Sequence, residues 1–235
     1  PGRITVDERD RLLAKFNGEL EPVPTLVTGL RVRKSAEEIV AIQAASELAE
    51  SVLADLLPSL HVGLPEQELA AMFEFAFKKR GASGPSFDTL ALFGPRSSLP
   101  HGSPGRRALE KGDIILLDFG CRCAGYCSDL TRTYTFGTII DRWFETVYAV
   151  VKDAQQAALK AIKSGASCRD VDAVARDRIK DAGYGDYFGH GLGHGVGVEI
   201  HEAPRLNPRS DAVLEEGMVV TVEPGVYIEG QYGIR

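Results

Sequence analysis

The hydrophobic positions of the chain fall into helical stretches that alternate with short strand-like runs. From Ser35 to Leu56, apolar residues recur every three or four positions, which predicts one long helix ending near Pro58. Ser35 followed three residues later by Glu38 forms a capping box, a signal for the start of such a helix. The same periodicity predicts three further helices, over residues 65–79, 141–162 and 168–181.

Strand-like runs lie between these helices. Residues 114–117 form a short apolar run and residues 125–134 are rich in Tyr and Thr, so both predict strands of one hairpin. Residues 88–93 predict another strand and residues 218–222 a buried one, and the glycine-rich stretch 189–202 is β-like because its apolar residues alternate. Strand pairs that alternate with long helices predict an α+β domain, in which helices cover one face of a curved antiparallel sheet.

Residues 1–30 differ from the rest of the chain. They predict one amphipathic helix over residues 6–16 and an extended, proline-containing stretch over residues 21–27, which is too little to fold alone. We therefore expect residues 1–30 to be the remnant of a preceding domain and its linker, and residues 31–235 to form the main domain. The chain does not begin with Met and stops directly after a strand-like run, so we expect it to be a fragment of a longer protein, truncated at its C-terminus.

Two aspartates flank the predicted hairpin. Asp118 ends the first strand and Asp129 lies in the second, and a turn centred on Cys123 and Ala124 places them directly opposite each other on one face. Cβ atoms paired in this way lie roughly 4.5–5.5 Å apart, and like charges so placed destabilise the pair. Two buried carboxylates in this arrangement share a proton or bind a cation, and a metal site is the interpretation that we favour.

Four of the five histidines lie in two loops rich in Gly or Pro: His101, His190, His194 and His201. Residues 189–204 hold three of them, together with five glycines in nine residues, which let the backbone approach a ligand closely. A phosphate-binding loop is the weaker alternative, because this segment carries no Lys and its alternation predicts a strand. A HExxH zinc helix is excluded, because no second His follows Glu202 at the required spacing.

Glu223 completes a candidate set of metal ligands. It closes an apolar run, where a carboxylate is costly to bury unless it is paired or ligated, and a salt bridge is the alternative for this residue. Together with Asp118, Asp129 and His194 it provides oxygen donors and one imidazole, which suit Mn²⁺, Co²⁺ or Zn²⁺ better than a thiolate site does. Two ions that share bridging carboxylates activate a water and polarise a carbonyl, so this set predicts hydrolysis.

Composition narrows the classes of partner. The net charge of −6 and the lack of a basic run argue against nucleic acid and anionic membranes as partners. The apolar runs are far shorter than the roughly 18 residues of a membrane span, and no signal-like segment opens the chain.

Three of the four cysteines cluster at positions 121, 123 and 127, without CxxC spacing. We therefore expect reduced thiols in a cytoplasmic protein, with a thiolate metal cluster as the alternative.

These motifs resemble those of the pita-bread metallopeptidases, most closely the Xaa-Pro aminopeptidase and Xaa-Pro dipeptidase (prolidase) branch. The similarity covers about residues 31–235 and is carried by residues 31–39, 117–120, 125–133, 190–204 and 221–227. The resemblance implies a pita-bread fold and a catalytic peptidase domain over residues 31–235. It also implies hydrolysis of the N-terminal Xaa-Pro bond by a dinuclear metal centre with a bridging hydroxide nucleophile. It further implies two divalent ions, with Mn²⁺ as the first candidate, peptide substrates with proline at the second position, and a homodimer.

The resemblance also implies how the metal ligands divide their roles. Asp118 would bind one ion through two oxygens, Asp129 and Glu223 would bridge both ions, and His194 would complete the shell of the other. Glu223 would in addition be the acid that shuttles protons. The family has a fifth ligand, a Glu just beyond the segment that corresponds to the end of this chain, so these residues alone are expected to bind metal poorly.

The remaining roles concern the substrate. The resemblance implies that His201 contacts the substrate and stabilises the tetrahedral intermediate, and that His101 lies near the scissile peptide. His190 would line the substrate pocket. Tyr227 and Arg235 would orient the metal ligands through hydrogen bonds.

Two alternatives stay open. Methionine aminopeptidases share the same metal ligands, but the helical segment after residue 34 and the loop over residues 98–102 favour the proline-directed branch. A catalytically inactive peptide-binding module of the same fold is the alternative outside the enzymes; such relatives usually lose ligands, whereas this chain keeps all four. Creatine hydrolysis without metal is a remote third possibility for the same reason.

Overall fold

The computed structural model describes residues 4–21, 23, 26–138 and 142–235. Its α-helices are α1 (Val6–Leu13), α2 (Leu26–Leu30), α3 (Ala36–Leu56), α4 (Glu66–Lys79), α5 (Arg142–Ala161) and α6 (Cys168–Asp181). The strands of its first part are β1 (Gly84–Pro85), β2 (Leu90–Phe93), β3 (Ile114–Phe119), β4 (Cys121–Cys123), β5 (Tyr126–Cys127) and β6 (Leu130–Thr135). Those of its second part are β7 (Gly193–Gly195), β8 (Glu202–Leu206), β9 (Val226–Ile228) and β10 (Tyr232–Ile234).

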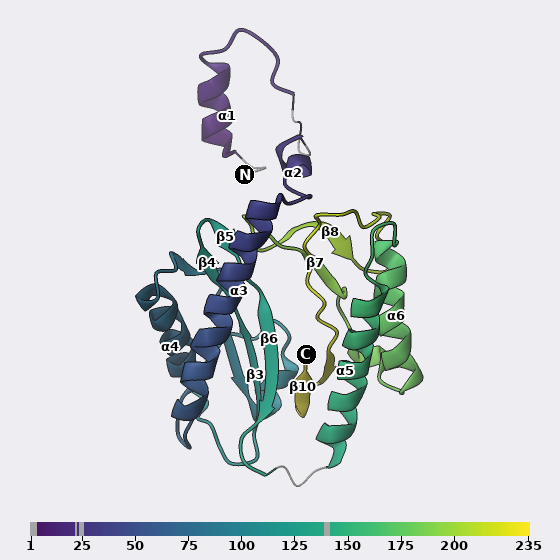
Figure 1. The fold of residues 1–235 in the computed structure, drawn as a ribbon. Coiled ribbons are helices and arrows are strands. Elements are labelled where there is room, and N and C mark those ends of the chain that lie inside the picture. The colour runs from purple at the N-terminus through teal and green to yellow at the C-terminus, as the bar shows by residue number, and fades with distance from the viewer. Residues whose placement is uncertain (1–3, 22, 24–25, 139–141) are drawn as a thin grey trace.

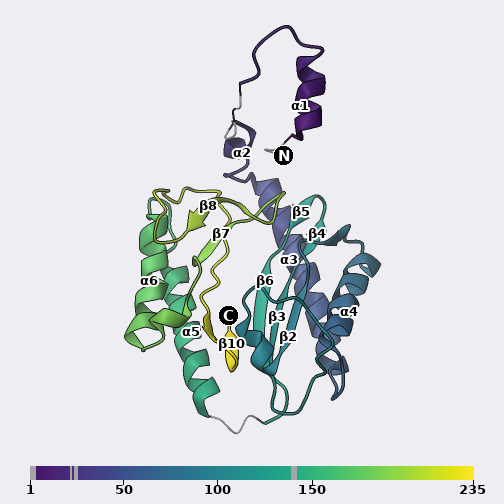
Figure 2. The same cartoon turned by 180° about the vertical axis from the view of Figure 1, so that it is seen from behind.

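The main body consists of two halves that lie side by side (Figure 1). In the first half, α3 and α4 pack beside the antiparallel sheet β2-β3-β6, and residues such as Phe73 and Phe119 form its core. In the second half, α5 and α6 pack beside the strand pairs β7-β8 and β9-β10 around a separate core that includes Val151 and Ile179. The C-terminus lies between the halves, and α1 stands clear of the body in both views (Figures 1 and 2).

The predicted α+β class is confirmed, and so are the main helices. Ser35 caps α3 as predicted, because its hydroxyl accepts a hydrogen bond from the Glu38 amide at 3.3 Å and the Glu38 carboxylate accepts one from the Ser35 amide at 2.7 Å. The predictions for α4 and α6 agree with the structure to within one residue. Helix α5 runs from residue 142, and the predicted start at residue 141 lies outside the described residues. No helix in the described ranges combines the length and apolar content that a membrane crossing requires.

The predicted register of the hairpin was wrong by two residues. The turn was predicted to be centred on Cys123 and Ala124. It is centred on Ala124 and Gly125, whose φ angles are positive, at 50° and 86°. A two-residue turn with positive φ at both positions matches the twist of the flanking strands, and glycine adopts this conformation without strain. As a result Asp118 pairs with Thr131, and Asp129 does not lie directly opposite it. A shift of two keeps both aspartates on the same face of the hairpin.

Other local predictions were also partly wrong. Helix α1 ends at Leu13, earlier than predicted, and the last two residues of the predicted extended stretch 21–27 belong to the short helix α2. Residues 22, 24 and 25 lie outside the described residues. The backbone bends over residues 198–201 rather than continuing β7, and the turn is closed by the Gly197 amide, which donates to the Glu199 carbonyl at 3.1 Å.

Residues 218–222 were predicted to form a buried strand, but they are half-buried and form only isolated bridges at Met218 and Val220. They run beside β7, where the Thr221 amide donates to the His194 carbonyl at 2.8 Å and the Val196 amide donates to the Val219 carbonyl at 3.2 Å. Residues 219–222 line a cavity of about 270 Å³ between the two halves, which accounts for the partial exposure of this segment.

Candidate metal centre

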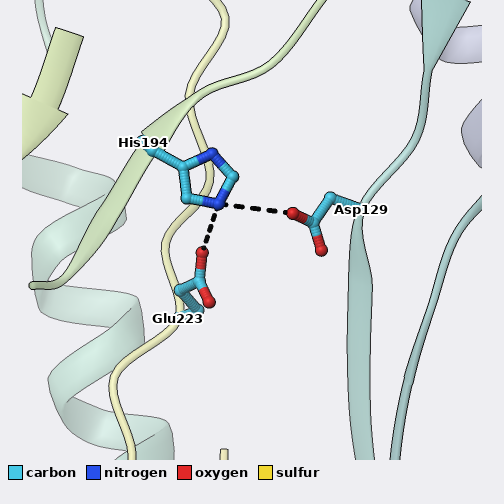
Figure 3. A group of neighbouring side chains, drawn as sticks. All are labelled: Asp129, His194 and Glu223. Atoms are coloured by element: carbon cyan, nitrogen blue, oxygen red, sulfur yellow. Dashed lines mark ion pairs between the residues drawn. The ribbon is translucent and has the colours of Figure 1, made fainter. Parts of the chain in front are cut away.

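Asp129, His194 and Glu223 converge from three separate segments of the chain (Figure 3). His194 Nε2 lies 3.4 Å from Asp129 Oδ2 and 3.1 Å from Glu223 Oε1, and one donor atom of each residue lies within 4.8 Å of the others. The side chains are 11%, 9% and 22% exposed, in the order Asp129, His194 and Glu223. Two carboxylates and one imidazole therefore share a largely buried volume.

The backbone around Gly193 brings His194 and Glu223 together. The Glu223 amide donates to the Leu192 carbonyl at 2.8 Å, so the segment carrying Glu223 is hydrogen-bonded along β7. This approach is so close that a Cβ atom at Gly193 would lie 2.0 Å from the Thr221 carbonyl oxygen. The glycines near His194 are therefore needed for the site to assemble.

Thr221 fixes two members of the cluster and was missed by the sequence analysis. Its hydroxyl donates to Glu223 Oε1 at 2.6 Å and accepts a hydrogen bond from the His194 amide at 3.0 Å. A signal for it existed, because residues two apart in an extended segment lie on the same face, and Thr221 precedes Glu223 by two.

Electrostatics in the cluster favour a cation. Burial alone would lower the pKa of His194, but the hydrogen bonds that it donates to the Asp129 and Glu223 carboxylates raise this pKa to about 10. Burial likewise opposes ionisation of Glu223, yet its bonds with His194 and Thr221 lower its pKa to about 2. The His194 Nδ1 lies 3.0 Å from the Gly195 carbonyl oxygen, to which it donates, so Nε2 is the nitrogen directed at the two carboxylates.

Asp118 lies at the same cavity but is paired with a different residue. Its Oδ2 lies 2.6 Å from Nη2 of Arg235, and its Oδ1 accepts a hydrogen bond from the Thr131 hydroxyl at 3.2 Å. Burial raises the pKa of Asp118 to about 7, with Arg235 opposing this shift and Asp129 adding to it. Asp118 therefore does not join the three-residue group, although it faces the same space.

Arg235, Tyr227 and His190 form a chain of hydrogen bonds beside the cluster. Arg235 Nη1 donates to the Tyr227 hydroxyl at 3.3 Å, and this hydroxyl lies 3.1 Å from His190 Nε2. His190 Nδ1 lies 2.8 Å from the Gly191 carbonyl oxygen. A carbonyl oxygen only accepts hydrogen bonds, so Nδ1 carries the proton of the neutral imidazole, and Nε2 accepts a hydrogen bond from the Tyr227 hydroxyl. Burial lowers the pKa of His190, which keeps the imidazole neutral in this chain.

A cavity of about 330 Å³ opens onto the cluster. It is lined by the three clustered residues and by Asp118, Arg235, His101 and His201, together with residues of the two adjoining loops. The His201 ring meets the His194 ring edge to face, with centroids 4.5 Å apart at 73°. His190 is not among the described residues that line the cavity, and it connects to the cavity through Tyr227 and Arg235.

The donor set fits a divalent metal ion. Oxygen donors with one imidazole are the ligands of hard or intermediate divalent ions. The Thr221 hydroxyl and the Gly195 carbonyl hold Glu223 and His194 from behind, as outer partners of metal ligands commonly do. The cysteines take no part in this group, and all four are free.

Comparison with known proteins identifies the family. Residues 40–235 match the model of metallopeptidase family M24, and the chain belongs to this family, whose members use divalent metal ions. It is 46% identical over 219 residues to the uncharacterized peptidase YqhT of Bacillus subtilis, covering 93% of this chain and 62% of that protein. It is 42% identical over 217 residues to the Xaa-Pro dipeptidase of Pyrococcus furiosus, covering 92% of this chain and 62% of that protein.

A solved structure gives the same result for the fold. The X-Pro aminopeptidase of Thermotoga maritima superposes with a TM-score of 0.94 at 38% identity, covering 99% of this chain and 66% of that one. The pita-bread fold and the resemblance to the Xaa-Pro branch are thereby confirmed. The chain spans about 62% of the length of the two curated relatives.

Proposed function

We propose that this chain is the catalytic part of a peptidase that hydrolyses the N-terminal Xaa-Pro bond of short peptides. The observation that carries the proposal is the cluster of Asp129, His194 and Glu223 at the base of a cavity that also exposes His101 and His201. The proline-directed specificity is supported by the names of the relatives from Pyrococcus furiosus and Thermotoga maritima. The cavity volume of about 330 Å³ lies within the range of small-molecule sites.

The residues proposed to hold the metal are Asp118, Asp129, His194 and Glu223. Two divalent ions, with Mn²⁺ first and Co²⁺ or Zn²⁺ as alternatives, would supply an activated water, shared as a bridging hydroxide, and would polarise the scissile carbonyl. Three carboxylates carry more negative charge than one divalent ion neutralises, which supports a dinuclear centre. A fifth ligand from outside these residues remains part of this proposal.

The chain's own residues would perform the remaining steps. The Glu223 carboxylate, which Thr221 holds in place, would take a proton from the attacking water and return it to the leaving nitrogen. His201 would contact the carbonyl oxygen as negative charge develops there, and His101 would contact the substrate near the scissile bond. Arg235 and the Tyr227–His190 pair would keep Asp118 and the ligand shell oriented.

The proposed oligomeric state and domain organisation follow from the same family resemblance. We propose a homodimer, and residues 31–235 as the catalytic domain behind a remnant of another domain. Four free cysteines, three of them buried, are typical of proteins in a reducing compartment, which supports the cytoplasm as the location.

The test is a metal-reconstitution assay on the longest natural chain that contains these residues. The protein is treated with a chelator, reloaded with Mn²⁺, Co²⁺ or Zn²⁺, and assayed on Ala-Pro, Ala-Pro-Ala and Met-Ala-Ser. Metal-dependent release of Ala from the proline peptides alone is the expected result, and the ratio of the two rates distinguishes a dipeptidase from an aminopeptidase. Cleavage of Met-Ala-Ser would instead assign the methionine branch, and a folded protein without turnover would indicate a binding module.

A further inference from the structure

The buried carboxylate of Glu202, the residue directly after His201, links the loop that carries His201 to the segment before α3. Its side chain is only 6% exposed and carries ion pairs with two cations of the segment before α3. Lys34 Nζ lies 3.1 Å from Glu202 Oε2, and Arg31 Nη2 donates to Glu202 Oε1. The Glu199 amide donates to the same Oε1 at 3.0 Å. One carboxylate therefore closes the loop over residues 199–202 and ties it to residues 31–34.

Lys34 is built into this junction and is not a surface residue. Its side chain is 2% exposed, and its Nζ also donates to the Val32 carbonyl at 3.2 Å. Its backbone amide donates to the Gly217 carbonyl at 2.7 Å, just before the segment that leads to Glu223. The buried Lys34 ammonium thus has both a carboxylate and a carbonyl as acceptors. Such partners offset the free energy lost when a charge is removed from water.

The loop that carries His201 depends on such contacts for its shape. Its backbone bends over residues 198–201, and the Cys127 amide anchors it by donating to the Gly197 carbonyl at 2.8 Å. The His201 side chain is exposed to the cavity and makes its ring contact with His194. No hydrogen bond links the His201 ring to any residue in the part of the chain that the structure describes, so the loop backbone sets where this imidazole points.

We propose that Glu202 is a positioning residue for His201, and that Lys34 and Arg31 hold it in place from the segment before α3. Through these ion pairs, Arg31 and Lys34 set the geometry of the histidine that faces the substrate. The expected effect on kcat rests on the proposed function. The placement of the His201 ring does not, because it follows from the contacts of Glu202 with Lys34, Arg31 and the Glu199 amide.

The test uses two variants that remove the charge pair and one matched control. Glu202→Gln keeps the size of the side chain, and Lys34→Met keeps the length of the buried stem. Arg33→Met is the control, because Arg33 adjoins Lys34 but forms an exposed pair with Glu215, with side chains 67% and 55% exposed. We expect kcat on Ala-Pro to fall about ten- to hundredfold in the first two variants, with metal content unchanged, and to stay at the wild-type value in the control.

A double-mutant comparison separates positioning from general stability. In a His201→Ala background, Glu202→Gln should cause no further loss of kcat, because the residue through which it acts is gone. An equal loss in both backgrounds, or wild-type kcat in Glu202→Gln, would overturn the proposal. If Glu202→Gln does not fold, Arg31→Gln provides the same comparison, since it removes the ion pairs of Arg31 with Glu202 and Glu199 and leaves the Lys34 pair.

A structural measurement keeps this inference separate from the proposed function. NMR of the imidazole protons should show contact between the His194 and His201 rings in the wild type and its loss in Glu202→Gln. Retention of that contact in the variant would refute the positioning role, whatever the activity. A wild type that shows the ring contact but cleaves no Xaa-Pro peptide would refute the proposed function alone.

Discussion

Asp118 and Arg235 form a nearly buried ion pair that joins the two halves of the molecule. Asp118 Oδ2 lies 2.6 Å from Arg235 Nη2, and the side chains are 15% and 5% exposed. The contact is electrostatic, because Arg235 Nη2 has no aligned hydrogen-bond acceptor among the described residues. Since Asp118 belongs to β3 and Arg235 follows β10, the pair holds the first half of the site against the second.

Removing the guanidinium should therefore destabilise the fold. Arg235→Met leaves a buried carboxylate without its partner, and we expect a loss of about 3–5 kcal/mol in the free energy of unfolding. Urea denaturation measures this loss. The control is Arg169→Met, which breaks an exposed pair with Asp211 and should cost less than about 1 kcal/mol. Equal effects of the two substitutions would show that the Asp118 pair is not buried in solution.

Asp129→Asn should weaken metal binding strongly. A neutral amide is a much poorer ligand than the carboxylate it replaces, so we expect loss of detectable turnover and at least about a hundredfold lower metal affinity, measured by calorimetry on chelator-treated protein. Asp153→Asn is the matched control, since Asp153 is 71% exposed and lies away from the cluster in a pair with Arg178. Unchanged metal affinity in Asp129→Asn would remove this residue from the site.

Thr221 should act on the metal through Glu223 and His194. Thr221→Val has the same shape but cannot donate to Glu223 Oε1, so metal affinity should fall about ten- to hundredfold. Thr221→Ser restores the hydroxyl and should recover most of the affinity. A serine variant as weak as the valine variant would indicate that packing of the methyl group, rather than the hydrogen bond, is what matters.

Stability should depend on pH through Glu202. Burial raises the pKa of this carboxyl, but the Glu199 amide, Arg31 and Lys34 together lower it below the usual value for Glu, which is about 4.3. A carboxyl with a depressed pKa stabilises the fold at pH values above its unfolded pKa, and this contribution is lost as the pH falls through the folded pKa. Urea midpoints should therefore fall more steeply below about pH 4.3 in the wild type than in Glu202→Gln. Parallel curves for the two proteins would contradict this assignment.

The sequence predicts those parts of the fold that local patterns determine. The capping box at Ser35 and the helical periodicity after it correctly place α3. Of the four predicted metal ligands, Asp129, His194 and Glu223 lie close together in the structure, and their role as ligands stays a prediction. The register of the hairpin was missed because it depends on which two residues adopt positive φ, and the pattern does not distinguish Cys123–Ala124 from Ala124–Gly125.

Contacts between distant segments are harder to predict. The family resemblance implied that Arg235 orients the metal ligands, but no local pattern indicates that Asp118 is the ligand with which it pairs, and nothing near Glu202 indicates Lys34. Such pairs follow from how the halves pack, since a buried charge needs a partner but the sequence does not specify which one. These residues complete the site, and only the folded chain brings them together.

The most direct test of the metal centre is a crystal structure with Mn²⁺, with anomalous data collected at the manganese absorption edge. The account predicts anomalous peaks within about 2.0–2.6 Å of the Asp129 and Glu223 carboxylates, with one peak also at the imidazole of His194. Peaks only at other positions, such as the cysteines of the β4–β5 hairpin, or no peak in crystals soaked at millimolar Mn²⁺, would contradict the central claim.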